Sequence, residues 1–154
     1  MSVTINTTVN GKSVSASAEA STSLLEFLRD TLEYKGTKLC CNTGECGACT
    51  IIYNGKPINS CVTMAADANG AQIITIEGLA DGDKLHPVQQ AFIDTGAVQC
   101  GYCTPGYIMS VKALLDRTKT PTMQDIEEAV SGNSCRCTGY AKIVDAINLA
   151  AQKL

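Results

Sequence analysis

The chain has 154 residues, 45% of them apolar, and a formal net charge of −3. This is the composition of one or two ordinary globular domains, and the acidic balance argues against a nucleic-acid partner. No stretch approaches the roughly 18 apolar residues of a membrane span, and the N-terminus MSVTINTTVNGKSV lacks the basic and apolar blocks of a secretory signal, so we expect a cytoplasmic protein.

The N-terminal residues predict a β-hairpin followed by a helix. Residues 3–9 and 12–18 alternate apolar and polar side chains on either side of Asn10-Gly11, a dipeptide typical of tight hairpin turns. Ser23 and Glu26 form a capping-box pattern before the amphipathic run LLEFLRDTL, which predicts a helix that stops before the next glycine.

A cysteine-rich loop follows this helix, and a second hairpin follows the loop. The segment TIIYNGKPINS has Asn54-Gly55 at its turn, and QIITIEG reads as a closing strand. Residues 1–77 therefore predict a small β-rich domain with one helix.

The periodicity changes after the turn-rich stretch EGLADGDK. Apolar residues then recur at the spacing of three and four that is typical of helices, in HPVQQAFIDTG, TPGYIMSVKALLDRT, TPTMQDIEEAVSG and TGYAKIVDAINLAAQKL. Prolines mark the helix starts and glycines the helix ends, at Pro87, Pro105, Pro121, Gly96 and Gly132. We expect an α+β protein in which residues 78–84 link the first domain to a four-helix bundle over residues 85–154.

The nine cysteines favour metal ligation. A reducing compartment argues against disulfides, and small domains of this size often add a metal site to a limited core. Disulfides are the alternative for a secreted chain. Nine cysteines would then leave one thiol unpaired, however, and the close pairs Cys40/Cys41 and Cys135/Cys137 make awkward partners for local bridges.

The first group of cysteines comprises Cys41, Cys46, Cys49 and Cys61. Its C-x4-C-x2-C spacing with a distant fourth cysteine is that of plant-type [2Fe–2S] ligands. Gly44, Gly47 and Ala48 suit the sharp turns that aim backbone N–H groups at sulfur. A zinc site with four thiolates is the alternative, although this spacing is unusual for zinc.

The second group comprises Cys100, Cys103, Cys135 and Cys137. Spacing alone favours zinc and iron–sulfur about equally here. Cys103 precedes Thr104-Pro105 and Cys137 precedes Thr138-Gly139, so each pair is expected at a helix N-terminus. Free N–H groups and the helix dipole favour anionic thiolates at such positions.

Three motifs, GTKLCCNTGECGACT, QCGYCTPG and NSCRCTGY, resemble the small iron–sulfur subunit of the xanthine oxidase family of molybdenum hydroxylases, and the resemblance covers essentially the whole chain. It implies a ferredoxin-like β-grasp domain and a four-helix domain, each holding one [2Fe–2S] cluster on the four cysteines named above. It also implies two partners: a large subunit with a molybdenum pterin cofactor and a medium subunit with FAD.

The resemblance further implies a path for electrons, from molybdenum through the helical-domain cluster and the β-grasp cluster to FAD. It places Gln99 and Cys137 against the molybdenum pterin, whereas without it Gln99 would be only a polar residue at a helix end. The loop around Glu45 would then face the flavin side.

Two residues are expected to have no metal-binding role. The family mostly has glycine where this chain has Cys40, and the spacing to Cys46 fits Cys41, so we expect Cys40 to be a free thiol packed under the loop. Competition between Cys40 and Cys41 is the alternative. His86, the only histidine, is expected to be a structural polar residue.

No nucleotide fingerprint, nucleophile–base pair or open metal site is evident in the sequence, so we expect no bond chemistry from the isolated chain. The expected role is that of the electron-transfer subunit of a molybdenum-containing oxidoreductase. A free-standing two-cluster ferredoxin and a zinc-binding interaction module are the alternatives. The substrate of the complex is not encoded here, because specificity in the family lies in the large subunit.

Overall fold

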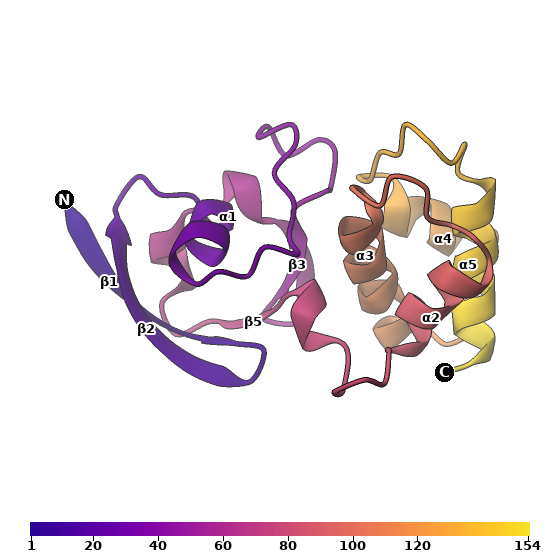
Figure 1. Cartoon of the computed structure of the whole chain (residues 1–154), viewed down its shortest axis with the longest axis horizontal. Helices are drawn as coiled ribbons and strands as arrows, with labels where there is room; N and C mark the ends of the chain where they lie inside the picture. Colours follow the sequence, from indigo (N-terminus) through magenta and orange to yellow (C-terminus); the bar gives the residue numbers. More distant parts are fainter.

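The computed structural model describes residues 1–154, and it places a sheet-containing part beside a helical part, with the two termini at opposite ends (Figure 1). The first part contains a five-stranded sheet of order β2-β1-β5-β3-β4, in which β1 and β5 are parallel and the other neighbours antiparallel. The strands are β1 Ser2–Val9, β2 Lys12–Glu19, β3 Thr50–Tyr53, β4 Lys56–Asn59 and β5 Gln72–Ile74.

Both predicted hairpins are confirmed. Asn10 and Gly11 join β1 to β2 with φ angles of 52° and 77°, and Asn54 and Gly55 join β3 to β4 with φ angles of 47° and 80°. Positive φ at both central residues is what a type I′ turn requires, and Asn-Gly adopts it at low cost. Local turn chemistry therefore sets the register of both strand pairs.

The predicted first helix begins at its capping box, where the Ser23 hydroxyl accepts from the Glu26 N–H and the Glu26 carboxylate accepts from the Ser23 N–H. It is α1, Leu24–Glu26, and it continues as a wider π-helical turn, η1, Phe27–Thr31. Its apolar face covers one side of the sheet. Three short 3₁₀ turns complete this part: η2 Ser60–Val62, η3 Ala65–Ala68 and η4 Ile76–Gly78.

Four helices lie where the apolar spacing predicts them, at α2 Pro87–Asp94, α3 Thr104–Arg117, α4 Met123–Val130 and α5 Ala141–Gln152. They enclose a separate core that includes Phe92, Leu115 and Ile147. His86 has the expected structural role, because its Nδ1 caps α2 by accepting from the Val88 N–H at 3.2 Å. None of the helices has the length and apolar character needed to cross a bilayer.

Strand β3 joins the two parts because its side chains alternate between the two faces of the sheet. Ile51 points into the core beneath α1, whereas Ile52 packs against Met109 and Ala113 of α3. These four side chains are buried, so the sheet and the helices meet in an apolar contact. The cysteine loops lie along one edge of this contact, the upper edge in Figure 1.

Candidate metal centres

The first cysteine group is gathered by the loop between η1 and β3 and by η2. Cys49 and Cys61 are buried and pack against each other beside Leu25. Cys41 and Cys46 are half-buried, and the Cys41 Sγ accepts from the Cys46 N–H at 3.4 Å. The group thus consists of an inner pair of thiols and an outer pair.

The backbone of this loop directs N–H groups at the sulfurs. Gly44 and Gly47 have φ angles of 81° and 67°, as the sequence led us to expect for turns around a metal centre. The N–H groups of Thr43 and Cys46 both donate to the Cys41 Sγ at 3.4 Å. Such donors stabilise the anionic sulfurs of a cluster.

Cys41 and Cys61 differ strongly in acidity. The Thr43 side chain and the N–H groups of Thr43 and Cys46 lower the pKa of Cys41 to about 5. Burial, and next the neighbouring Cys49 thiol, raise the pKa of Cys61 to about 12. A metal that binds Cys61 would therefore have to displace its proton, as metal binding to thiols generally does.

The second cysteine group repeats this arrangement at the boundary of the helices. Cys135 is buried and Cys103 half-buried, and their side chains interact directly within the helical core. Cys100 and Cys137 are exposed, with their Sγ atoms 3.5 Å apart. Burial, and next the Cys135 thiol, raise the pKa of Cys103 to about 12.

The helix-terminus prediction holds for one pair only. Cys103 is the N-cap residue of α3, as expected. Cys137 is not at a helix N-terminus, because Gly139 and Tyr140 have φ angles of 62° and 70°, and α5 begins only after this left-handed turn. Thr138 supplies the donors instead, with its Oγ1 3.0 Å and its N 3.4 Å from the Cys135 Sγ.

The Thr138 donors lower the pKa of the Cys135 thiol. Burial raises the pKa of Cys135, but the hydrogen bonds from Thr138 and the Cys137 N–H outweigh it and lower the value to about 7. The donor roles of Thr43 and Thr138 were not predicted from the sequence. A threonine shortly after a ligand is a detectable signal, however, since such side chains form local hydrogen bonds.

The two thiol groups fit a two-iron cluster, because each one presents two neighbouring pairs of sulfurs. A [2Fe–2S] cluster spreads four thiolates over two irons, and two thiol pairs side by side match that demand.

The remaining predicted residues lie at the surface. Gln99 is exposed in the turn between α2 and α3, next to Cys100, and makes no hydrogen bond within the chain. Cys40 is exposed, so the prediction that it packs under the loop was wrong. The reason is that the Leu39 carbonyl accepts from the Tyr102 hydroxyl, which holds this segment along the surface.

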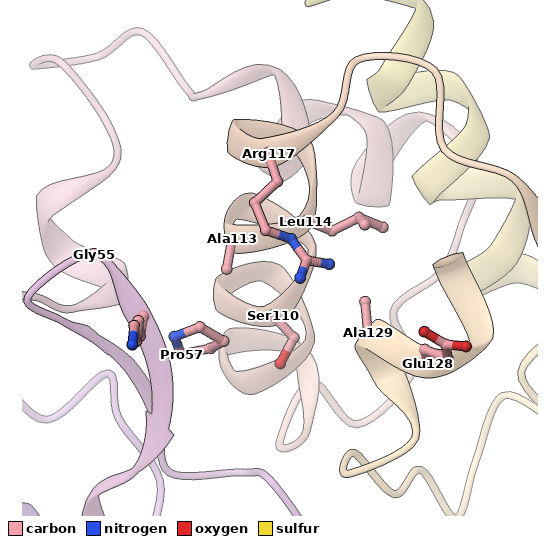
Figure 2. A pocket seen from close by; sticks show the side chains of 9 residues that line it. Gly55, Pro57, Ser110, Ala113, Leu114, Arg117, Glu128 and Ala129 are labelled. Atoms are coloured by element: carbon pink, nitrogen blue, oxygen red, sulfur yellow. The ribbon is translucent and has the colours of Figure 1, made fainter. Parts of the chain in front are cut away.

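A separate pocket of about 500 Å³ lies between the β3–β4 hairpin and helices α3 and α4, with Arg117 and Glu128 on its walls (Figure 2). No cysteine lines it. It is therefore distinct from both candidate metal centres, although Ser110 at its base reaches the second cysteine loop through Asn133.

Two family models together match most of the chain. One, described as a 2Fe-2S iron-sulfur cluster binding domain, matches residues 6–95. The other, described as a [2Fe-2S] binding domain, matches residues 75–148. Each match includes one complete group of four cysteines.

Known proteins resemble the chain along its length. The small FeS subunit of nicotinate dehydrogenase from Eubacterium barkeri is 47% identical over 151 residues, 98% of this chain and 96% of that protein. Quinoline 2-oxidoreductase from Pseudomonas putida 86 superimposes with a TM-score of 0.94 at 40% identity, over 98% of this chain and 94% of the matched chain. Aldehyde oxidoreductase from Desulfovibrio gigas gives a TM-score of 0.92 at 42% identity, over 97% of this chain but 17% of the longer protein.

Proposed function

The chain belongs to the small iron–sulfur subunits of the xanthine oxidase family of molybdenum hydroxylases, and from this premise we propose how it carries electrons within such a complex. The observation that carries the proposal is the presence of two four-thiol groups in neighbouring loops, each with an inner and an outer pair of sulfurs. This arrangement suits two one-electron centres in series, which can connect a two-electron oxidation to a distant acceptor.

We assign one [2Fe–2S] cluster to Cys41, Cys46, Cys49 and Cys61 and a second to Cys100, Cys103, Cys135 and Cys137. When bound, each cluster supplies a centre that accepts and releases one electron. The chain contributes the thiolates and the N–H and hydroxyl donors of Thr43 and Thr138. We divide it into a β-grasp domain over residues 1–77, a linker over 78–84 and a four-helix bundle over 85–154.

The proposed partners are a large subunit with the molybdenum pterin and a medium subunit with FAD. Electrons would enter at the helical-domain centre, where Gln99, Cys100 and Cys137 are exposed, and leave from the β-grasp centre toward the flavin. None of the nine cysteines is in a disulfide, which supports the reducing cytoplasm as its compartment. The relatives include a nicotinate dehydrogenase, a quinoline 2-oxidoreductase and an aldehyde oxidoreductase, so we propose an N-heterocycle or an aldehyde as substrate of the large subunit.

Metal and sulfide analysis tests the cluster assignment. The purified full chain should contain about four irons and four acid-labile sulfides, because two [2Fe–2S] clusters hold that number. The reduced protein should show two distinguishable paramagnetic signals, since one centre lies in a loop and the other between helices. Stoichiometric zinc without labile sulfide would show instead that the chain is a zinc-binding module.

The Gln99→Ala variant tests the proposed entry point. It should keep both clusters and the assembly of the complex, because Gln99 is exposed and bonds nothing within the chain. It should slow the reduction of the clusters by substrate, because a lost interface hydrogen bond costs roughly 1–3 kcal/mol. Rapid-mixing spectra of the assembled complex measure this rate.

A matched control is Gln124→Ala, which removes another exposed glutamine that bonds only Glu128 on α4. This control should reduce at the wild-type rate. If Gln99→Ala also reduces at the wild-type rate, Gln99 has only the role of a polar residue in a turn.

A further inference from the structure

The side chain of Asn133 lies between the two cysteine loops. The residue is 7% exposed, and its Nδ2 donates to the carbonyl oxygen of Gly47 at 3.1 Å. Its Oδ1 accepts from the Ser110 hydroxyl at 2.8 Å, and its own carbonyl accepts from the Tyr107 hydroxyl at 2.6 Å. Helix α3 thus orients Asn133, and Asn133 in turn binds the first cysteine loop, which lies between η1 and β3.

A second bond lies directly beside the first. The N–H of Ser134 donates to the carbonyl oxygen of Cys46 at 3.0 Å. Cys46 precedes Gly47, and Cys135 follows Ser134, so one bond is made by a proposed ligand residue and the other by its neighbour in the chain. The loops are therefore joined beside their metal-binding residues rather than at a remote point.

The fit between the loops is close. A Cβ on Gly47 would lie 2.4 Å from Asn133 Nδ2 and 2.4 Å from the carbonyl oxygen of Gly132. A Cβ on Gly106 would lie 2.1 Å from the carbonyl oxygen of Gly47. Since neither position leaves room for a methyl group, a small displacement of either loop would break the pair of bonds or create a clash.

We propose that Asn133 is a positioning residue that fixes the spacing and relative orientation of the two metal centres by locking residues 46–47 to residues 133–134. This inference rests on the proposed function, because it concerns electron exchange between two clusters. Both that exchange and the magnetic coupling of two reduced clusters fall steeply with distance. A lock beside the ligand residues therefore sets the rate of this exchange inside the subunit before any partner binds.

The test uses Asn133→Asp in the full chain with both clusters reduced. The aspartate keeps an oxygen for the Ser110 hydroxyl but places its other oxygen against the Gly47 carbonyl, so the donor to the first loop is lost. We expect about four irons per chain, as in wild type. We also expect a smaller or broadened spin–spin splitting in the paramagnetic resonance spectrum, and exchange of the Ser134 amide that is faster by about tenfold or more.

Asn10→Asp is the matched control. Asn10 also bridges distant segments, since its Nδ2 donates to the Thr75 hydroxyl and its Oδ1 accepts from the Thr75 N–H, but it touches neither cysteine loop. The same chemical change there should leave the splitting and the Ser134 amide unaltered. A purely structural role for Asn133 would lower stability without changing the splitting.

Ser110→Ala provides a milder second variant if Asn133→Asp loses a cluster. It removes the hydroxyl that orients the Asn133 side chain and leaves Asn133 itself intact. Faster Ser134 exchange and a changed splitting in either variant support the lock. Wild-type splitting and exchange in a fully loaded variant overturn it while the cluster assignment stands, whereas a wild-type chain without labile sulfide overturns the proposed function instead.

Discussion

Cys41→Ser should lose about half of the iron of the chain, roughly two of four atoms, while the helical-domain cluster remains. A hydroxyl is a harder and weaker ligand for iron than a thiolate. The surroundings of Cys41 also favour its thiolate form, because the Thr43 side chain and the N–H groups of Thr43 and Cys46 lower its pKa to about 5. Iron and sulfide analysis, with the spectrum of the remaining cluster, measures the loss.

Cys40→Gly is the control for this prediction. Cys40 is exposed and bonds no other cysteine, so its replacement should leave about four irons in place. The two adjacent substitutions should therefore behave very differently. Loss of the cluster in Cys40→Gly together with its retention in Cys41→Ser would place the ligand assignment one residue out of register.

The elements that the sequence predicts well are those with local causes. The Asn-Gly dipeptides determine both hairpin turns, and the pairing of Ser23 with Glu26 determines where the first helix begins. Apolar spacing and proline positions locate all four later helices. In each of these cases the interaction that decides the structure joins residues close together in the chain.

The predictions that failed depended on backbone conformation or on distant contacts. The sequence placed the start of α5 too early. Tyr140 takes a positive φ, which is uncommon for a residue other than glycine and is not indicated by the neighbouring sequence TGY. The surface position of Cys40 follows from the bond between Leu39 and Tyr102, which are 63 positions apart. Cysteine spacing predicted the two thiol groups, but it contains no information on which thiols are buried.

The contact between the two cysteine loops could not be predicted from the sequence either. Asn133 and Gly47 are 86 positions apart, and either residue alone has an ordinary explanation, one in a polar turn and the other in a sharp loop. Only the fold shows that the asparagine side chain meets the backbone of the other loop. Gly106 is a third member of this contact, and it allows a test of how tightly the two parts are held.

Gly106→Ala should destabilise the protein even though it improves the helix. In the first turn of α3, alanine would favour helix formation by up to about 1 kcal/mol over glycine. The new Cβ would lie 2.1 Å from the Gly47 carbonyl oxygen and 3.1 Å from the Ala48 Cα, both backbone atoms that cannot rotate away. Forcing extra atoms into a packed site typically costs roughly 1–3 kcal/mol and occasionally more, so we expect a net loss of stability.

Thermal unfolding of the cluster-loaded chain measures this effect, with Gly132→Ala as its control. For a chain of this size each 1 kcal/mol lost lowers the midpoint by about 2–4 °C. A Cβ on Gly132 meets no atom within 4 Å, and its φ lies outside the left-handed region, so this variant should unfold at the wild-type temperature. If Gly106→Ala is as stable as Gly132→Ala, the first cysteine loop can move away from α3, and the two centres are not held at a fixed spacing by this contact.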